Sequence, residues 1–159
     1  MNAFETFNVE AYLAGLPRRN IKLLPVGIQI PKFRASGHLS DYNGFTSKER
    51  LRTFEIAKWL IASEAMQHTE RCSICGAAAD QQHAEDYFDL HTWMDICRSC
   101  HTSLHSRFRT PDAWERRLAS HSLPTDHWAV RLPAFPIDVA AFHRSRGRSE
   151  PVGAQFVVQ

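Results

Sequence analysis

The sequence has no long run of apolar residues and carries little net charge. Its opening residues, MNAFETFNVE, contain neither the basic start nor the apolar core of a secretory signal, and no later run approaches the length of a membrane span. These absences argue against export and membrane insertion, and they predict a cytoplasmic protein. The formal net charge of +2 is too small to indicate a binding partner by itself.

Cysteine is scarce, and every cysteine belongs to a CxxC pair. The four residues are Cys72, Cys75, Cys97 and Cys100. In a reducing compartment, two matched pairs indicate metal binding, whereas a thioredoxin-like redox role would need only one pair. Two such knuckles can place four thiolates at about 2.3 Å from one ion. We therefore predict one structural Zn²⁺ bound by these cysteines.

The chain is long enough for one principal domain with appendages. We expect an N-terminal helix and extended arm in residues 1–45, a helix plus zinc module in residues 46–122, and an irregular extension with a basic tail in residues 123–159. The clearest element is a helix from residue 46 to about residue 67. It begins with the capping box of Thr46 and Glu49, and apolar residues including Phe54 and Leu60 return at helical spacing.

Shorter elements surround the cysteines. Residues 81–96 are expected to form a two-stranded ribbon, and residues 98–108 a helix that starts on the second knuckle. A further helix begins at Thr110 and Pro111, with Trp114 and Leu118 on one face, and a short helix is predicted for residues 137–143. Residues 21–30 favour an edge strand or arm, and Asn43-Gly44 marks a turn. The predicted fold class is α+β.

Three histidines are candidate site residues. One lies in the predicted ribbon, and two follow the second cysteine pair. His101 and His105 are four residues apart, so both project from one helix face and can bind a single divalent ion, which would act as a Lewis acid on a phosphate. His83 lies on the facing strand and can take a proton from water. Guanidinium groups suit phosphate oxygens, and the candidates are Arg98, Arg107 and Arg109. The pattern predicts a phosphodiester hydrolase with catalytic His83, His101 and His105.

The segments CSICG, QHAEDY and DICRSCHTSLH, between residue 72 and about residue 108, resemble the HNH endonucleases. The resemblance implies a treble-clef or ββα-metal core on a four-cysteine zinc. It also implies cleavage of DNA to a 5′-phosphate and a 3′-hydroxyl, with a catalytic metal such as Mg²⁺, Mn²⁺, Ni²⁺ or Zn²⁺. The family places Asp or His, as a metal ligand, before its general-base histidine. Gln82 stands there, so Glu85 or Asp86 is expected to supply the ligand. The family's middle Asn, which orients the general-base histidine, falls near Thr92, where His91 could substitute.

A second class of function stays open. The zinc module could bind DNA, RNA or a protein partner without cleaving it, while its histidines serve the structure. A carboxylate that reaches the His101 and His105 pair would favour cleavage, and its absence would favour binding. DNA is the expected partner, with RNA and a homodimer left open. The sequence does not indicate a target site.

Overall fold

The computed structural model describes residues 7–22 and 37–151. Its elements, in chain order, are α1 (Val9–Ala14), α2 (Ser47–Ala62), β1 (Gln81–His83), the 3₁₀ helix η1 (Leu90–Thr92), β2 (Met94–Ile96), α3 (Arg98–Ser106), α4 (Pro111–Ala119) and α5 (Val139–Arg144). The combination of helices with a small sheet agrees with the predicted α+β class. Most of the predicted strand at 21–30 and the end of the basic tail lie outside the described residues.

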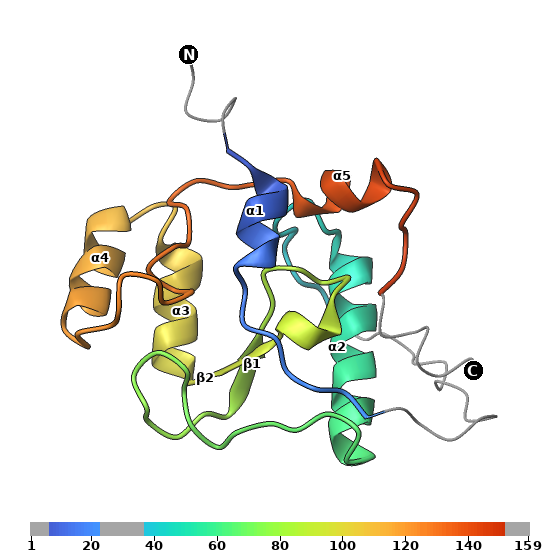
Figure 1. Ribbon diagram of the computed structural model, residues 1–159, viewed down its shortest axis with the longest axis horizontal. Helices are drawn as coiled ribbons and strands as arrows, with labels where there is room; N and C mark the ends of the chain where they lie inside the picture. Colours follow the sequence, from blue (N-terminus) through green and yellow to red (C-terminus); the bar gives the residue numbers. More distant parts are fainter. Residues whose placement is uncertain (1–6, 23–36, 152–159) are drawn as a thin grey trace.

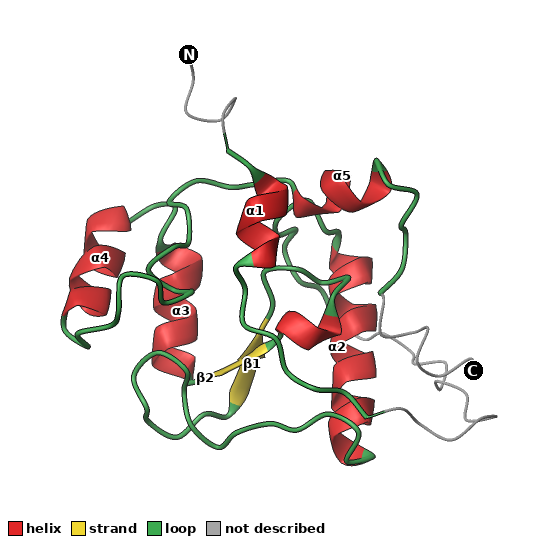
Figure 2. Ribbon diagram, viewed as in Figure 1, coloured by secondary structure: helices red, strands yellow, loops and turns green. Residues whose placement is uncertain are grey.

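The two-stranded sheet lies near the middle of the molecule, between α2 on one side and α3 on the other (Figure 1). Helix α4 packs outside α3, and α1 and α5 lie side by side at one end. Colouring by secondary structure shows how much of the remaining chain is loop (Figure 2). Of these helices, α3 makes the most contacts with the sheet, through β1.

Helix α2 has the predicted start and a shorter course. The Thr46 and Glu49 capping box is formed in both directions. The helix ends at Ala62 rather than near residue 67, because Glu64 adopts a left-handed conformation with φ 57°. Leu60 is buried at 1% exposure, as predicted, whereas Phe54 is 37% exposed. The apolar stripe of this helix is thus only partly covered.

The ribbon and the second helix of the zinc-module region form as predicted. Strands β1 and β2 pair antiparallel, with His83 opposite Met94. Cys97 caps α3, and its Sγ accepts a hydrogen bond from the backbone N–H of Cys100 at 3.4 Å. In α4, Trp114 and Leu118 are both buried. The local spacing of capping and apolar residues was sufficient to locate these elements.

The predicted turn at Asn43-Gly44 is present. Both residues have positive φ, 49° and 80°, and Tyr42 bridges Phe45 across the turn. This conformation is typical of a tight hairpin turn and suits asparagine followed by glycine. The turn points Tyr42 and Asn43 into the protein, where both are buried.

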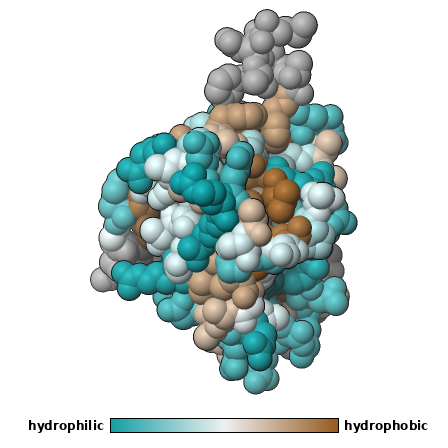
Figure 3. All heavy atoms as spheres, turned by 90° about the vertical axis from the view of Figure 1, so that its left-hand side faces the viewer, coloured by the Kyte–Doolittle hydropathy of each residue, from teal (hydrophilic) through white to brown (hydrophobic). Residues whose placement is uncertain are grey.

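One hydrophobic core includes residues from all three predicted segments. It contains Tyr12 and Leu16 from the first, Leu60 and Leu104 from the second, and Val139 from the third. No helix within residues 7–22 and 37–151 is long and apolar enough to cross a bilayer. On the face at the α4 side of the molecule, hydrophilic residues predominate and hydrophobic ones appear in patches (Figure 3).

Candidate metal centres

The four cysteines come together in what we call the cysteine cluster. It comprises Cys72, Cys75, Cys97 and Cys100, whose sulfurs all lie within 4.8 Å of one another. The Sγ atoms of Cys75 and Cys97 are 3.7 Å apart. A zinc tetrahedron with Zn–S bonds of about 2.3 Å has edges of about 3.8 Å. The cysteine cluster is therefore positioned to hold a metal ion and is compatible with zinc.

Backbone geometry builds the first knuckle. Gly76 takes a φ of 74°, and its N–H donates to the Cys72 carbonyl at 2.9 Å. Burial raises the pKa of the Cys72 thiol, but backbone N–H groups, among them that of Cys75, outweigh burial and lower it to about 7. From α4, Arg117 donates to Cys100 Sγ at 3.4 Å. Backbone donors thus favour the thiolate, which is the metal-binding form, at Cys72, whereas burial and the neighbouring cysteines raise the pKa of Cys100 to about 12 despite the Arg117 contact.

The three predicted histidines also converge, in what we call the histidine cluster. It comprises His83 from β1 and His101 and His105 from α3, each offering a ring nitrogen within 4.8 Å of the others. Nε2 of His105 lies 3.0 Å from Nε2 of His101. The His83 ring centroid is 5.3 Å from that of His101 and 5.2 Å from that of His105. Strand and helix therefore present their imidazoles to one point.

Hydrogen bonds to other side chains leave a bare nitrogen on two of these rings. Nδ1 of His101 is 2.8 Å from Oε1 of Gln81, which can only accept, so the proton is on Nδ1 and Nε2 is bare. His83 is 1% exposed, and its Nε2 is 2.6 Å from Oε1 of Glu85. The other nitrogen of His83, Nδ1, is buried and has no hydrogen-bond partner among the described residues. A metal ion at the cluster would satisfy this nitrogen.

Burial also keeps two of the imidazoles neutral. Desolvation, together with the nearby His83 imidazole, lowers the pKa of His101 to about 4. Desolvation and the same neighbour lower the pKa of His105 to about 3. Neutral imidazole is the form that binds metals, so both rings are ready to act as ligands at neutral pH.

Glu85 does not reach the His101 and His105 pair as expected, but forms the centre of a buried network beneath His83. Its carboxylate accepts hydrogen bonds from Tyr12 at 2.8 Å, from Tyr42 at 2.6 Å and from Asn43 at 2.8 Å. Burial would raise the pKa of Glu85, but the His83 hydrogen bond and the Arg107 charge hold it well below its usual range. Glu85 is therefore an ionised group that orients His83.

Asp86, the other expected carboxylate, also lies outside the histidine cluster. It is buried, and its Oδ2 is 2.8 Å from Nε2 of His143 on α5. Gln82 donates to Asp95 at 3.2 Å. Within the described residues no carboxylate belongs to the cluster, and His83 stands in the place where one was expected.

The three predicted phosphate-binding arginines occupy different environments. Arg107 is completely buried, with its Nε donating to the Pro133 carbonyl at 2.8 Å and one terminal nitrogen donating to Tyr42 at 3.0 Å. It balances the charge of Glu85 and is not accessible to a phosphate. Arg98 and Arg109 are exposed and remain available.

Two further expectations concerned the orientation of His83. His91 lies 3.0 Å from the Arg19 carbonyl through Nδ1, and Thr92 donates to the Asp89 carbonyl at 2.8 Å. The contact that orients His83 is with Glu85 instead.

The sequence reasoning missed Gln81, which fixes the tautomer of His101. A signal was present, because Gln81 lies two residues before His83 and alternate strand residues share a face. It also missed the Tyr42, Asn43 and Arg107 network, which no local spacing indicates.

Comparison with known proteins leaves the site to be interpreted from its own geometry. No protein-family model matches the sequence, and searches of curated proteins and of solved structures found no similar chain.

Proposed function

We propose that this protein is a metal-dependent endonuclease of the HNH type, which hydrolyses phosphodiester bonds in DNA. The observation that carries the proposal is the convergence of three imidazoles, two of them with a bare nitrogen fixed by a neighbouring side chain. Three protein ligands that leave a position for water or substrate are typical of catalytic zinc sites. The order of knuckle, ribbon, second knuckle and helix supports the treble-clef or ββα-metal assignment.

In this proposal His83 is the third metal ligand rather than a free general base. Its Nε2 is engaged by Glu85, so Nδ1 is the nitrogen left for a metal. A histidine ligand whose second nitrogen bonds a carboxylate is a common feature of metal sites, because the carboxylate fixes the ring and raises its basicity. When bound, a divalent ion supplies Lewis-acid chemistry to a phosphate oxygen and activates water.

The surrounding residues orient the rings and shape the site. Gln81 and Glu85 hold two of the imidazoles in place. Trp128 stacks on His83 with ring centroids 6.3 Å apart, and the ring centroids of Tyr42 and His105 are 4.7 Å apart. Aromatic rings therefore cover part of the cluster. His101 also borders a cavity, so one member of the cluster lies at a hollow of the protein.

Plasmid nicking in Mg²⁺, Mn²⁺, Ni²⁺ or Zn²⁺ tests the proposal. His105→Ala should slow cleavage by about 100-fold or more, because Lewis-acid stabilisation is worth several kcal/mol, while the zinc on the cysteine cluster is retained. His121→Ala is the matched control, because His121 is exposed and lies outside both clusters. Parent-like cleavage by His105→Ala would overturn the proposed site.

The non-catalytic alternative is favoured by the burial of His83 and by the lack, among the described residues, of a carboxylate in the histidine cluster. In that case the histidine cluster holds a second structural metal. Chelation would then lower the melting temperature, and no tested metal would give cleavage of either DNA or RNA.

A further inference from the structure

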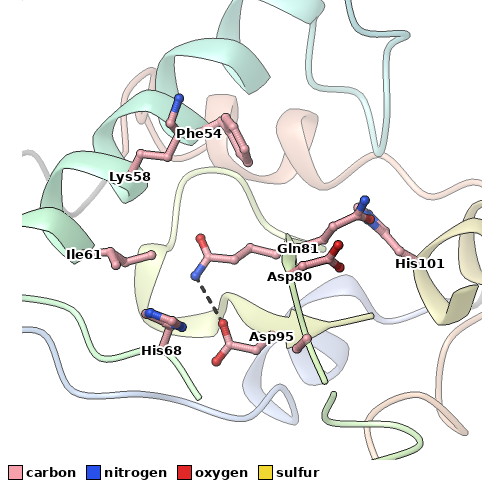
Figure 4. Close-up of a pocket in the computed structure, with 10 residues that line it drawn as sticks. Phe54, Lys58, Ile61, His68, Asp80, Gln81, Asp95 and His101 are labelled. Atoms are coloured by element: carbon pink, nitrogen blue, oxygen red, sulfur yellow. Dashed lines mark hydrogen bonds between the residues drawn. The ribbon is translucent and has the colours of Figure 1, made fainter. Parts of the chain in front are cut away.

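A cavity of about 420 Å³ lies between α2 and the sheet. Phe54, Lys58 and Ile61 of α2 form one wall, and His101 with Gln81 lies at the far end (Figure 4). Ligand sites commonly measure about 300–1,000 Å³, so the cavity can hold a small planar group. His101, which lines the cavity, is also a member of the histidine cluster.

The cavity combines an apolar wall with amide groups. Phe54 is 37% exposed, and Val130, at 40%, is the other large apolar side chain exposed in the described part of the chain. The Gln82 amide nitrogen donates to Asp95, and the Gln81 amide oxygen accepts from His101. The remaining Gln82 oxygen and Gln81 NH₂ group make no hydrogen bond to any described residue. These two groups lie at opposite ends of the cavity, because Gln82 points toward Asp95 and Gln81 toward His101 (Figure 4).

This combination suits a nucleobase. Bases outside a duplex are recognised by aromatic or apolar packing on the ring and by hydrogen bonds to their polar edge. A single amide side chain can supply one such hydrogen bond, as a donor or as an acceptor. Lys58, at the α2 wall, forms an exposed ion pair with Glu55 at 3.3 Å, and Asp80 and Asp95 also line the cavity.

We propose that this cavity binds one unpaired nucleobase of the strand whose phosphate lies at the histidine cluster. The proposal rests on the endonuclease function and narrows its substrate to single-stranded or locally unpaired nucleic acid. A base stacked within a duplex cannot enter such a cavity unless it leaves the stack. Leaving the stack has a free-energy cost that an unpaired base does not incur. Phe54 and the two amides are then specificity residues.

Binding is tested without cleavage, by fluorescence anisotropy in buffer with no added divalent ion. The probes are a labelled twelve-nucleotide thymidine strand and a strand of the same length made of tetrahydrofuran abasic units, so the phosphates match and only the bases differ. The parent should bind the thymidine strand about 5- to 150-fold more tightly, the range that stacking of a base on an aromatic ring gives.

Variants at the exposed aromatic ring locate the preference. Phe54→Ala should abolish most of it, Phe54→Trp should retain it, and Val130→Ala, a matched truncation of an exposed side chain outside the cavity, should leave it unchanged. Equal affinity of the parent for both strands, or a Phe54→Ala variant with the parent's preference, would overturn the base site.

Cleavage of the same two strands separates this proposal from the endonuclease function. Faster cleavage of the thymidine strand, reduced in Phe54→Ala, supports both. Equal cleavage of both strands would contradict the base site and support the endonuclease function. A base preference in binding without cleavage in any metal removes the endonuclease and leaves a base-binding cavity.

Discussion

The cysteine cluster and the histidine cluster lie in one module but depend on very different lengths of chain. Both knuckles are formed by local contacts, such as the Gly76 N–H to the Cys72 carbonyl. The hydrogen-bond network around Glu85 and His83 instead includes Tyr12, which is 73 residues from Glu85 in the sequence, and Tyr42, which is 43 residues from it. Local spacing thus specifies the first cluster, and the packing of the whole chain specifies the second.

The two clusters also differ in how many protein ligands they offer. The cysteine cluster supplies four sulfurs, which completes a tetrahedron, whereas the histidine cluster supplies three nitrogens. His83 retains a buried nitrogen without a protein partner. We therefore expect the cysteines to govern folding and the histidines to govern chemistry.

The largest expected effect is the loss of folding at the cysteine cluster. Cys100→Ser should release zinc and unfold the region from residue 71 to residue 109, because structural zinc contributes about 10–16 kcal/mol in small zinc domains. Elemental analysis and near-ultraviolet circular dichroism measure both outcomes. His105→Ala, the comparison variant, should keep its zinc and its spectrum. A zinc-filled, native-like Cys100→Ser protein would remove the distinction between the clusters.

Breaking the buried network should come next in size. Glu85→Ala should lower the free energy of unfolding by about 3–5 kcal/mol, because it leaves the buried Arg107 charge unpaired. Urea denaturation gives the value. In the double variant Glu85→Ala and Arg107→Leu, the loss should be smaller than the sum of the two single losses. Additive losses would show that the two side chains do not stabilise each other.

A smaller effect is expected from the residue that fixes His101. Gln81→Leu should weaken binding of a divalent metal to the histidine cluster by about 10- to 100-fold, because its hydrogen bond to Nδ1 of His101 orients the ligand ring. Calorimetric titration of zinc-filled protein with Mn²⁺ or Ni²⁺ measures this. Gln82→Leu is the control, since that amide bonds Asp95 and not a histidine. Equal weakening by both variants would contradict a specific role for Gln81.

The smallest expected effect concerns Glu49, which belongs to neither cluster. Burial would raise the pKa of Glu49, but the Thr46 backbone N–H and Arg144 lower it below its ordinary 4.5. The carboxylate therefore stabilises the fold fully above about pH 4.5, and this contribution is lost as the pH falls through the lowered pKa. Glu49→Gln should cost about 0.5–1 kcal/mol at pH 7, with metal content unchanged.

Denaturation of the Glu49→Gln protein and its parent across this pH range measures the difference between them. The difference should shrink as the pH falls below 4.5. A constant difference would show that the charge of Glu49 does not contribute.

The sequence predicted those parts that short-range patterns determine. The capping box of α2, the His101 and His105 spacing and each CxxC pair depend on residues a few positions apart, and the paired strands are joined by one short connection. The buried Arg107 was expected at the surface, since arginine is rarely buried without a partner and Glu85 was assigned elsewhere. Whether Glu85 meets the metal or supports His83 depends on where Tyr12 and Tyr42 lie. No spacing in the sequence predicts the positions of these two tyrosines.

The hydrogen bond from Arg107 to the Pro133 carbonyl has a consequence for the order of events during synthesis. In a chain growing on a ribosome, both cysteine pairs have emerged once residue 100 is outside, so zinc can organise the knuckles early. The anchor for Arg107 follows more than thirty residues later by sequence number, and His143, the partner of Asp86, later still. Under the proposed function, a nascent chain would carry a folded zinc module without an ordered hydrolytic centre. That centre would become ordered only after Pro133 and His143 have also emerged.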